Sequence, residues 1–306
     1  MNSQKIKSLS LLFLIIINLC AIAASFYLYL STSRNYLIDK VSIHPVVAED
    51  WQTEDDSITL YGEIHYPFGF NTNVVYPSVL LFHGYGRSLN DYSVFIKDLN
   101  QRGILCFAID FRGFGKSTGT FPSDGALYNA SFGDAMAAFQ YLRSHPNVNK
   151  SNIVALGTSL GAGSSLFLAV MNQTNKFVLW YPAVDYYLGN KLLFEYDLPF
   201  SNAQALIMVG TEDECTRCKP QDVQYFVDRN GLEIYWLQGA RHTDSRYYQE
   251  VVSHTLNWFE NLWNLPKPTL IQSFIANQIL TYGILGAVVL IDILYFVRLW
   301  IVKRKR

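Results

Sequence analysis

Short apolar runs alternate with segments of helical periodicity over most of the chain, and this alternation limits the fold more than any other sequence feature. The apolar runs predict strands at 74–82, 104–110, 153–156, 177–181, 205–209 and 232–237. The periodic segments predict helices at 91–101, 131–144, 160–171, 220–228 and 245–263. Strands that are apolar on both faces and separated by helices form a parallel sheet covered on both sides. We therefore predict a single α/β domain with a mostly parallel sheet and helices on both faces.

One serine stands between two glycines where a predicted strand meets a predicted helix, in the stretch Gly157-Thr-Ser-Leu-Gly161. A sharp strand-to-helix turn exposes the side chain of Ser159 at the carboxyl edge of the sheet, where open α/β sheets bind ligands. Glycine at both ends of the motif lets strand and helix approach closely. A flexible Gly/Ser turn without chemistry is the alternative, and partner residues at neighbouring strand ends decide between the two.

An acid and a histidine follow two later strands. Asp213 comes shortly after the strand at 205–209 and His242 shortly after the strand at 232–237, so both are expected at the same edge as Ser159. A serine hydroxyl needs a base to become nucleophilic, and a carboxylate fixes the tautomer of that base. We predict Ser159 as nucleophile, His242 as base and Asp213 as acid. Three other carboxylates remain alternatives for the acid: Glu212, Glu214 and Asp185.

Four places in the chain resemble the α/β-hydrolase superfamily. They are LLFHGYGRS at 80–88, AIDFRGFGKSTG at 108–119, GTSLGAG at 157–163, and the pair GTED and GARH that carries the acid and the histidine. The resemblance covers nearly the whole of 57–264 and implies the α/β-hydrolase fold with no cofactor and no metal. It also implies an oxyanion hole formed by the backbone N–H groups of Tyr85 and Leu160, with His83 structural. Residues implied to order the loop behind the site are Asp110, Arg112 and Gly113.

The same resemblance implies a serine hydrolase that cleaves lipid or small acyl esters through an acyl-enzyme intermediate. A peptidase of the prolyl-aminopeptidase-like type is the first alternative, and a non-catalytic binding protein on the same fold is the second. The aromatic-rich stretch 181–203 is expected either to line an acyl pocket or to pack on the sheet. A formal net charge of −1 gives no support for a nucleic-acid partner. The expected partners are an ester substrate and a membrane, and the oligomeric state is open.

A cysteine pair, Cys215-Thr-Arg-Cys218, stands where relatives have an apolar-proline turn after the acid. An oxidising compartment favours a disulfide between Cys215 and Cys218 that braces the loop beside Asp213. A redox pair and two free thiols are the alternatives. A zinc site is disfavoured, because the sequence contains no second Cys/His pair with ligand spacing.

Two apolar segments, 11–30 and 279–297, flank the predicted domain, and each is long enough to cross a bilayer as a helix. Basic residues precede the first segment and follow the second, which favours cytoplasmic termini and an outer, periplasmic, lumenal or extracellular domain. The predicted organisation is 1–30 as N-terminus and signal-anchor, 31–268 as hydrolase domain, and 269–306 as C-terminal transmembrane helix and basic tail. A signal peptide cleaved near Ala23 is the alternative for the first segment.

Overall fold

The computed structural model describes residues 37–46, 57–122 and 130–265, together with three isolated positions, Asn18, Cys20 and Ala23. One compact unit extends from Leu37 to Lys267. Within the described residues, no helix combines the length and the hydrophobicity needed to span a bilayer. Apart from those isolated positions, the predicted membrane segments 11–30 and 279–297 lie outside the described part of the chain, as do the predicted domain boundaries at 30/31 and 268/269.

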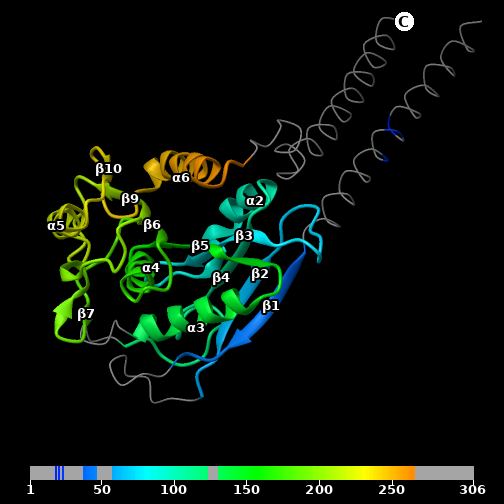
Figure 1. The fold of residues 1–306 in the computed structure, drawn as a ribbon, viewed down its shortest axis with the longest axis horizontal. Helices are drawn as coiled ribbons and strands as arrows, with labels where there is room; N and C mark the ends of the chain where they lie inside the picture. The colour runs from blue at the N-terminus through cyan, green and yellow to red at the C-terminus, as the bar shows by residue number, and fades with distance from the viewer. Residues whose placement is uncertain are drawn as a thin grey trace, which may run out of the picture. The chain divides into compact units, whose positions relative to one another are not determined.

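An eight-stranded sheet forms the centre of this unit (Figure 1). Its strand order is β1-β2-β4-β3-β5-β6-β9-β10. The pairs β1–β2 and β2–β4 are antiparallel, and every other neighbouring pair is parallel. The strand bounds are β1 Ile38–Ile43, β2 Leu60–His65, β3 Tyr76–Phe82, β4 Leu105–Ile109, β5 Val148–Thr158, β6 Lys176–Trp180, β9 Gln204–Gly210 and β10 Ile234–Leu237. The parallel strands end at one common edge, which is the edge that carries the predicted site.

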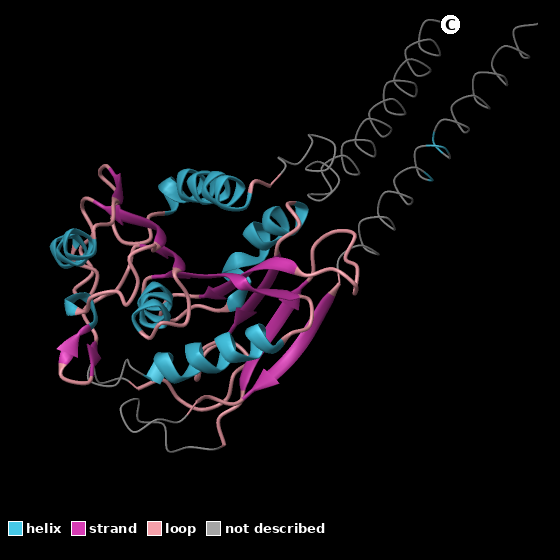
Figure 2. Cartoon of the chain, viewed as in Figure 1, coloured by secondary structure: helices cyan, strands magenta, loops and turns pink. Residues whose placement is uncertain are grey.

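Helices cover both faces of the sheet (Figure 2). Apolar side chains of α3, α4 and α5 pack in the core on one face, and those of α2 and α6 pack on the other. The helix bounds are α2 Ser93–Gln101, α3 Ala130–Ser144, α4 Leu160–Val170, α5 Pro220–Asn230 and α6 Tyr248–Trp263. Short 3₁₀ turns lie at Leu89–Tyr92, Leu193–Glu195 and Ser245–Tyr247. The central strand β4 is buried along its whole length, as the apolar runs predict for a sheet covered on both sides.

The predicted α/β class and mostly parallel sheet are confirmed, but the sequence analysis missed four strands. Strands β1 and β2 form the antiparallel end of the sheet. Most residues of β1 are exposed, and β2 alternates buried with half-buried residues, so no apolar run marks either strand. A small hairpin, β7 Tyr187–Leu188 and β8 Lys191–Leu192, lies within the aromatic stretch after β6. Strand β5 extends from Val148 and is therefore longer than the apolar run that predicted it.

Candidate active site

Ser159 occupies a sharp turn between β5 and α4. Its backbone has φ 55° and ψ −115°, a conformation that a residue with a side chain adopts at an energetic cost. The N–H of Ser159 donates to the carbonyl of Trp180 at the end of β6 (2.9 Å), and its carbonyl accepts the N–H of Gly163 in α4 (3.1 Å). These hydrogen bonds fix the strained turn, with Ser159 at the carboxyl edge of the sheet.

Two glycines permit the close approach that this turn requires. A Cβ atom on Gly157 would lie 2.1 Å from the carbonyl carbon and oxygen of Gly161. A Cβ atom on Gly161 would lie 2.0 Å from the carbonyl oxygen of Phe82, the last residue of β3. Both distances are far below van der Waals contact. Any side chain at either position would therefore separate the elements that present Ser159.

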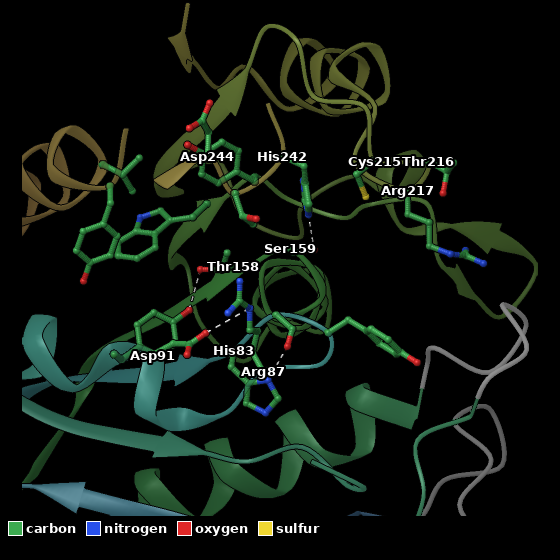
Figure 3. Close-up of a pocket in the computed structure, with 18 of the residues that line it drawn as sticks. His83, Arg87, Asp91, Thr158, Ser159, Cys215, Thr216, Arg217, His242 and Asp244 are labelled. Atoms are coloured by element: carbon green, nitrogen blue, oxygen red, sulfur yellow. Dashed lines mark hydrogen bonds and ion pairs between the residues drawn. The ribbon is translucent and has the colours of Figure 1, made fainter. Parts of the chain in front are cut away.

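His242 connects the serine to a carboxylate. Its Nε2 lies 2.9 Å from Ser159 Oγ, as the dashed line in Figure 3 marks, and its Nδ1 lies 2.9 Å from Asp213 Oδ2. The Asp213 side chain has no exposed area, whereas the imidazole is 20% exposed. A proton on Nδ1 that faces the carboxylate leaves the Nε2 lone pair directed at the serine hydroxyl. The structure thus brings together the three residues that the sequence predicted for this chemistry.

The alternative acids lie in other environments. Asp185 Oδ2 is 3.8 Å from Lys219 Nζ. Glu214 Oε2 accepts the backbone N–H of His242 at 3.4 Å, so it contacts the main chain of the histidine. Glu212 is exposed. Among the described carboxylates, Asp213 is the one whose oxygen lies within hydrogen-bond distance of the imidazole.

The loop after β3 lies beside the serine turn. A Cβ atom on Gly84 would be 3.7 Å from Ser159 Cβ, so the predicted oxyanion loop is in van der Waals reach of the serine. Tyr85 follows in the same loop and lines the cleft together with Ser159. Leu160 is the first residue of α4, so its N–H has no intrahelical partner. The two predicted backbone donors therefore belong to two segments that both lie beside Ser159.

The side chain of Tyr92 links the ends of β3 and β5, the strands that precede those segments. Its hydroxyl donates to the carbonyl of Phe82 (2.8 Å) and lies 2.9 Å from Thr158 Oγ1. Tyr92 is almost completely buried. The sequence analysis did not identify this residue, because a tyrosine in a helical segment gives no indication of which strand ends it will reach.

Buried polar groups support the loops behind the site. The Nδ1 of His83 lies 2.7 Å from the carbonyl of Gly84 and Nε2 accepts the N–H of Phe111 at 3.0 Å, so both ring nitrogens are engaged within the protein. Burial lowers the pKa of His83, which agrees with a structural, neutral imidazole. Asp110 accepts the backbone N–H groups of Leu89 and Lys116, each at 2.8 Å.

A buried ion pair lies in the same region. Arg112 Nε donates to Asp134 Oδ1 at 3.0 Å, and the side chains are 3% and 0% exposed. Gly113 has φ +73°, and a Cβ atom there would lie 2.5 Å from the backbone nitrogen of Phe121. The stretch around Asp110, Arg112 and Gly113 is therefore an ordered structural loop, as its resemblance implied.

Known proteins share this architecture. Residues 75–198 match the family described as Hydrolase_4: Serine aminopeptidase, S33. The uncharacterized protein YfhR of Salmonella typhi is 33% identical over 171 residues, which cover 54% of this chain and 54% of that protein. The chain thus spans about half the length of this curated relative.

Solved structures extend the similarity over most of the described fold. The Pyrococcus furiosus esterase Pf2001 aligns with a TM-score of 0.55 and 20% identity, over 74% of this chain and 93% of that chain. Esterase 2 of Thermogutta terrifontis, phosphoramylated by tabun, aligns with a TM-score of 0.58 and 18% identity, over 76% and 97% of the two chains. The chain has the α/β-hydrolase fold. The fold that the four sequence motifs suggested is therefore confirmed.

The predicted disulfide is absent, because Cys215 and Cys218 are both free thiols in the structure. The N–H of Cys218 donates to the carbonyl of Cys215 at 3.1 Å, which closes a tight turn. The sulfur of Cys218 lies 3.8 Å from His242 Nε2 and 4.0 Å from Ser159 Oγ. The cysteine pair is therefore part of the candidate site and does not form a separate disulfide beside it.

The cysteines and the histidine change one another's ionisation. Burial lowers the pKa of His242, but the hydrogen bonds with Asp213 and Cys215 outweigh burial and raise it to about 9. The hydrogen bond with Cys218, assisted by His242 and opposed by burial, lowers the pKa of Cys215 to about 4. Burial, followed by the neighbouring Cys215, raises the pKa of the Cys218 thiol. The imidazole and the Cys215 thiolate thus stabilise each other's charge.

The candidate site opens into a cleft of about 620 Å³. Tyr181 and Tyr186, from the aromatic stretch after β6, line the cleft, whereas Phe194 and Tyr196 pack against the core. Some residues of this stretch therefore line the cleft and others pack on the core, and an acyl pocket stays a prediction. Arg217 lines the same cleft, and its guanidinium carbon lies 5.4 Å from the centroid of the Tyr186 ring.

Acidic residues that line the cleft are paired with arginines. Arg87 Nε lies 3.8 Å from Asp91 Oδ2, as Figure 3 also shows. Arg246 Nη2 lies 2.6 Å from Asp244 Oδ2. Among the described lining residues, these are the two acids. Each of these two carboxylates therefore already has a positively charged partner within the protein.

Proposed function

We propose that the chain is a serine hydrolase that cleaves lipid or small acyl esters through an acyl-enzyme intermediate on Ser159. One observation carries the proposal: His242 lies 2.9 Å from Ser159 Oγ and 2.9 Å from Asp213 Oδ2, at the mouth of an open cleft. The α/β-hydrolase fold supports it, since solved esterases share that fold. A binding protein would need neither the strained serine turn nor the paired imidazole and carboxylate.

In this mechanism His242 Nε2 accepts the hydroxyl proton as Ser159 Oγ attacks the ester carbonyl. The N–H groups of Tyr85 and Leu160 stabilise the oxyanion, and one such donor contributes about 2.7–4 kcal/mol to transition-state stabilisation. The imidazolium then gives its proton to the leaving alcohol, and the acyl group stays on Ser159. Water, deprotonated by the same imidazole, releases the acid and restores the serine. Asp213 orients the imidazole and stabilises its charged form throughout.

A serine aminopeptidase is the second candidate, because the matching family carries that description. An aminopeptidase must bind the free ammonium group of its substrate, and a buried or poorly solvated cation requires a carboxylate partner. The two acids among the described lining residues, Asp91 and Asp244, are each paired with an arginine. This pairing favours an uncharged acyl ester over a peptide with a free N-terminus.

A fluorophosphonate probe tests the nucleophile. We expect covalent labelling of the wild-type protein, no labelling of Ser159→Ala, and a fall in ester hydrolysis by roughly four to six powers of ten in that variant. Ser144→Ala, which changes an exposed serine at the end of α3, is the matched control and should label normally. Undiminished labelling of Ser159→Ala would disprove the assignment.

A substrate panel then separates the two candidate activities. Nitrophenyl esters of increasing acyl length are compared with aminoacyl and prolyl nitroanilides under identical conditions. We expect turnover of the esters and little turnover of the anilides. Preferential cleavage of prolyl anilides would instead support the aminopeptidase.

We also propose that this hydrolase is tethered to a membrane by segments 11–30 and 279–297, with both termini cytoplasmic and the domain on the outer side. The apolar length of each segment and the basic residues beside it support this proposal. Protease added to intact cells or sealed spheroplasts should digest residues 31–268 and leave a C-terminal tag protected. Digestion of the tag with protection of the domain would overturn the topology.

A further inference from the structure

Three metal-ligand side chains converge beside Ser159. The Sγ atoms of Cys215 and Cys218 and a ring nitrogen of His242 all lie within 4.8 Å of one another. Two loops supply them, one after β9 and one after β10, and these strands are neighbours in the sheet. Sequence spacing gave no third ligand for the cysteine pair, because His242 lies 24 residues beyond Cys218.

We propose that Cys215, Cys218 and His242 form an inhibitory binding site for a thiophilic divalent cation, with Zn²⁺ as the ion that fits this ligand set. Two thiolates and one imidazole are among the ligand combinations that zinc favours, and three protein ligands leave one position for water or for Ser159 Oγ. The binding of the ion is independent of the proposed function. The inhibition rests on the proposed function, because it assumes that His242 acts as the base.

The distances between the ligand atoms suit a tetrahedral ion. Zn–S bonds of ~2.3 Å and Zn–N bonds of ~2.0–2.1 Å place two ligand atoms about 3.5–3.8 Å apart. Cys218 Sγ already lies 3.8 Å from His242 Nε2. The tight turn closed by the Cys218 N–H and the Cys215 carbonyl (3.1 Å) keeps both cysteines on one short segment. Cys215 Sγ lies within 4.8 Å of the other two ligand atoms, about 1 Å more than the tetrahedral separation.

Asp213 orients two of the three ligands. Its Oδ2 lies 2.9 Å from His242 Nδ1, and its Oδ1 accepts the backbone N–H of Cys215 at 3.0 Å. Metal-bound histidines commonly donate the other ring N–H to a carboxylate, which fixes the tautomer and aims the free nitrogen at the ion. The carboxylate that prepares His242 for Ser159 therefore also prepares it for a metal.

Metal binding and catalysis compete for one lone pair. The Nε2 atom that would accept the Ser159 proton is the atom within reach of Cys218 Sγ. An ion bound to Nε2 occupies the lone pair that would otherwise accept the serine proton. On binding, the thiols release their protons to solvent and each sulfur donates an electron pair to the ion, so no electron transfer occurs. When a chelator removes the ion, the thiols take up protons again and the Nε2 lone pair becomes free. The hydrolase would thus be silenced while the ion is bound and active once it is removed.

Co²⁺ provides a direct test without any activity assay. The full chain, reduced and freed of metal with a chelator, is titrated with Co²⁺, whose bond to thiolate produces a near-ultraviolet charge-transfer band. We expect one equivalent of Co²⁺ to give this band and Zn²⁺ to displace it. Cys215→Ser, Cys218→Ser and His242→Ala should each weaken Co²⁺ binding at least tenfold.

Two variants serve as controls for ligand identity. Ser159→Ala retains all three ligands and should bind Co²⁺ as the wild type does. Cys106→Ala removes a thiol that is buried in β4, and should leave the band intact. Absence of a stoichiometric band in the wild type, or its persistence in a Cys215→Ser/Cys218→Ser double variant, would overturn the site. Thermal melting provides a second measurement of the metal ligands. Zn²⁺ should raise the melting temperature of Ser159→Ala but not that of either single cysteine variant.

Fluorophosphonate labelling in the presence and absence of Zn²⁺ connects binding to catalysis. We expect one equivalent of Zn²⁺ to slow labelling of the wild type at least tenfold and a chelator to restore the original rate. In each cysteine variant, Zn²⁺ should leave the labelling rate at its metal-free value. A Co²⁺ band without any labelling would leave the metal site standing and defeat the proposed hydrolase. Labelling that continues unchanged at saturating Zn²⁺ would defeat the inhibition.

Discussion

The two halves of the candidate site are built in different ways. The half behind the serine turn consists of loops after β3 and β4, fixed by buried groups such as His83, Asp110 and the Arg112–Asp134 pair. The half that carries the base consists of loops after β9 and β10, in which His242 and Cys215 remain partly exposed. Apart from the predicted oxyanion donor at Tyr85, the first half therefore contributes mainly to stability, whereas the second half contains the predicted acid and base. Substitutions in the two halves should affect different measurements.

Asp213→Asn should have the largest effect of all, and on rate rather than stability. An amide in place of the carboxylate favours the wrong tautomer of His242, and we expect hydrolysis to fall by about three to four powers of ten. The free energy of unfolding should change little. Steady-state kinetics and urea denaturation of the same protein measure both quantities.

Asp185→Asn is the matched control for that variant, since Asp185 was the main alternative acid and lies near Lys219. Its rate should remain within about threefold of wild type. A collapse of activity in Asp185→Asn with little loss in Asp213→Asn would reverse the assignment of the acid.

Asp134→Ala should have the opposite profile. Removal of the carboxylate leaves the charge of Arg112 buried without its partner, which costs about 3–5 kcal/mol of unfolding free energy. Urea denaturation followed by circular dichroism measures this loss. The exposed pair of Asp197 and Arg229 offers the control, because water solvates both charges and Asp197→Ala should cost far less. Equal losses in the two variants would contradict the proposed division between the halves.

The pH dependence of kcat/KM should report the environment of His242. A general base acts in its neutral form, so a pKa raised from its ordinary value to about 9 makes the rate increase with pH up to about 9. Cys215→Ser removes a negative neighbour that stabilises the imidazolium, and it should move the rising limb to lower pH. Ester hydrolysis from pH 6 to 10 in buffer with a chelator measures the shift. An identical limb in both proteins would remove Cys215 from this role.

Tyr92→Phe should have the smallest effect. The variant loses the hydroxyl that joins Phe82 to Thr158, and we expect a loss of about 1–2 kcal/mol of unfolding free energy and a change in rate of less than tenfold. Tyr225→Phe, at a half-exposed position, is the control and should change stability by no more than ~0.5 kcal/mol. A large change in rate with unchanged stability would show that Tyr92 acts on the reaction and not on the stability of the fold.

Sequence patterns predicted the reactive residues because parallel strands end at one edge. Ser159, Asp213 and His242 each follow an apolar run, so their convergence is a consequence of strand direction. The antiparallel strands β1 and β2 were missed because the exposed residues of β1 and the polar, half-buried residues of β2 interrupt the apolar pattern. The state of the cysteines was not predictable either. Whether Cys218 bonds to Cys215 or approaches His242 depends on side-chain directions, which spacing does not encode.

The order of the site residues along the chain has a consequence for synthesis. Strands β3, β4 and β5 and the turn with Ser159 leave the ribosome before β9 and β10, which bring Asp213 and His242. Because domains fold as units during elongation, a nascent chain that stops short of β10 contains the nucleophile but lacks the base. Hydrolytic competence would therefore begin late, when the last strand enters the sheet. In a series of ribosome-arrested lengths, the first chain able to react with a fluorophosphonate would mark the completion of the sheet.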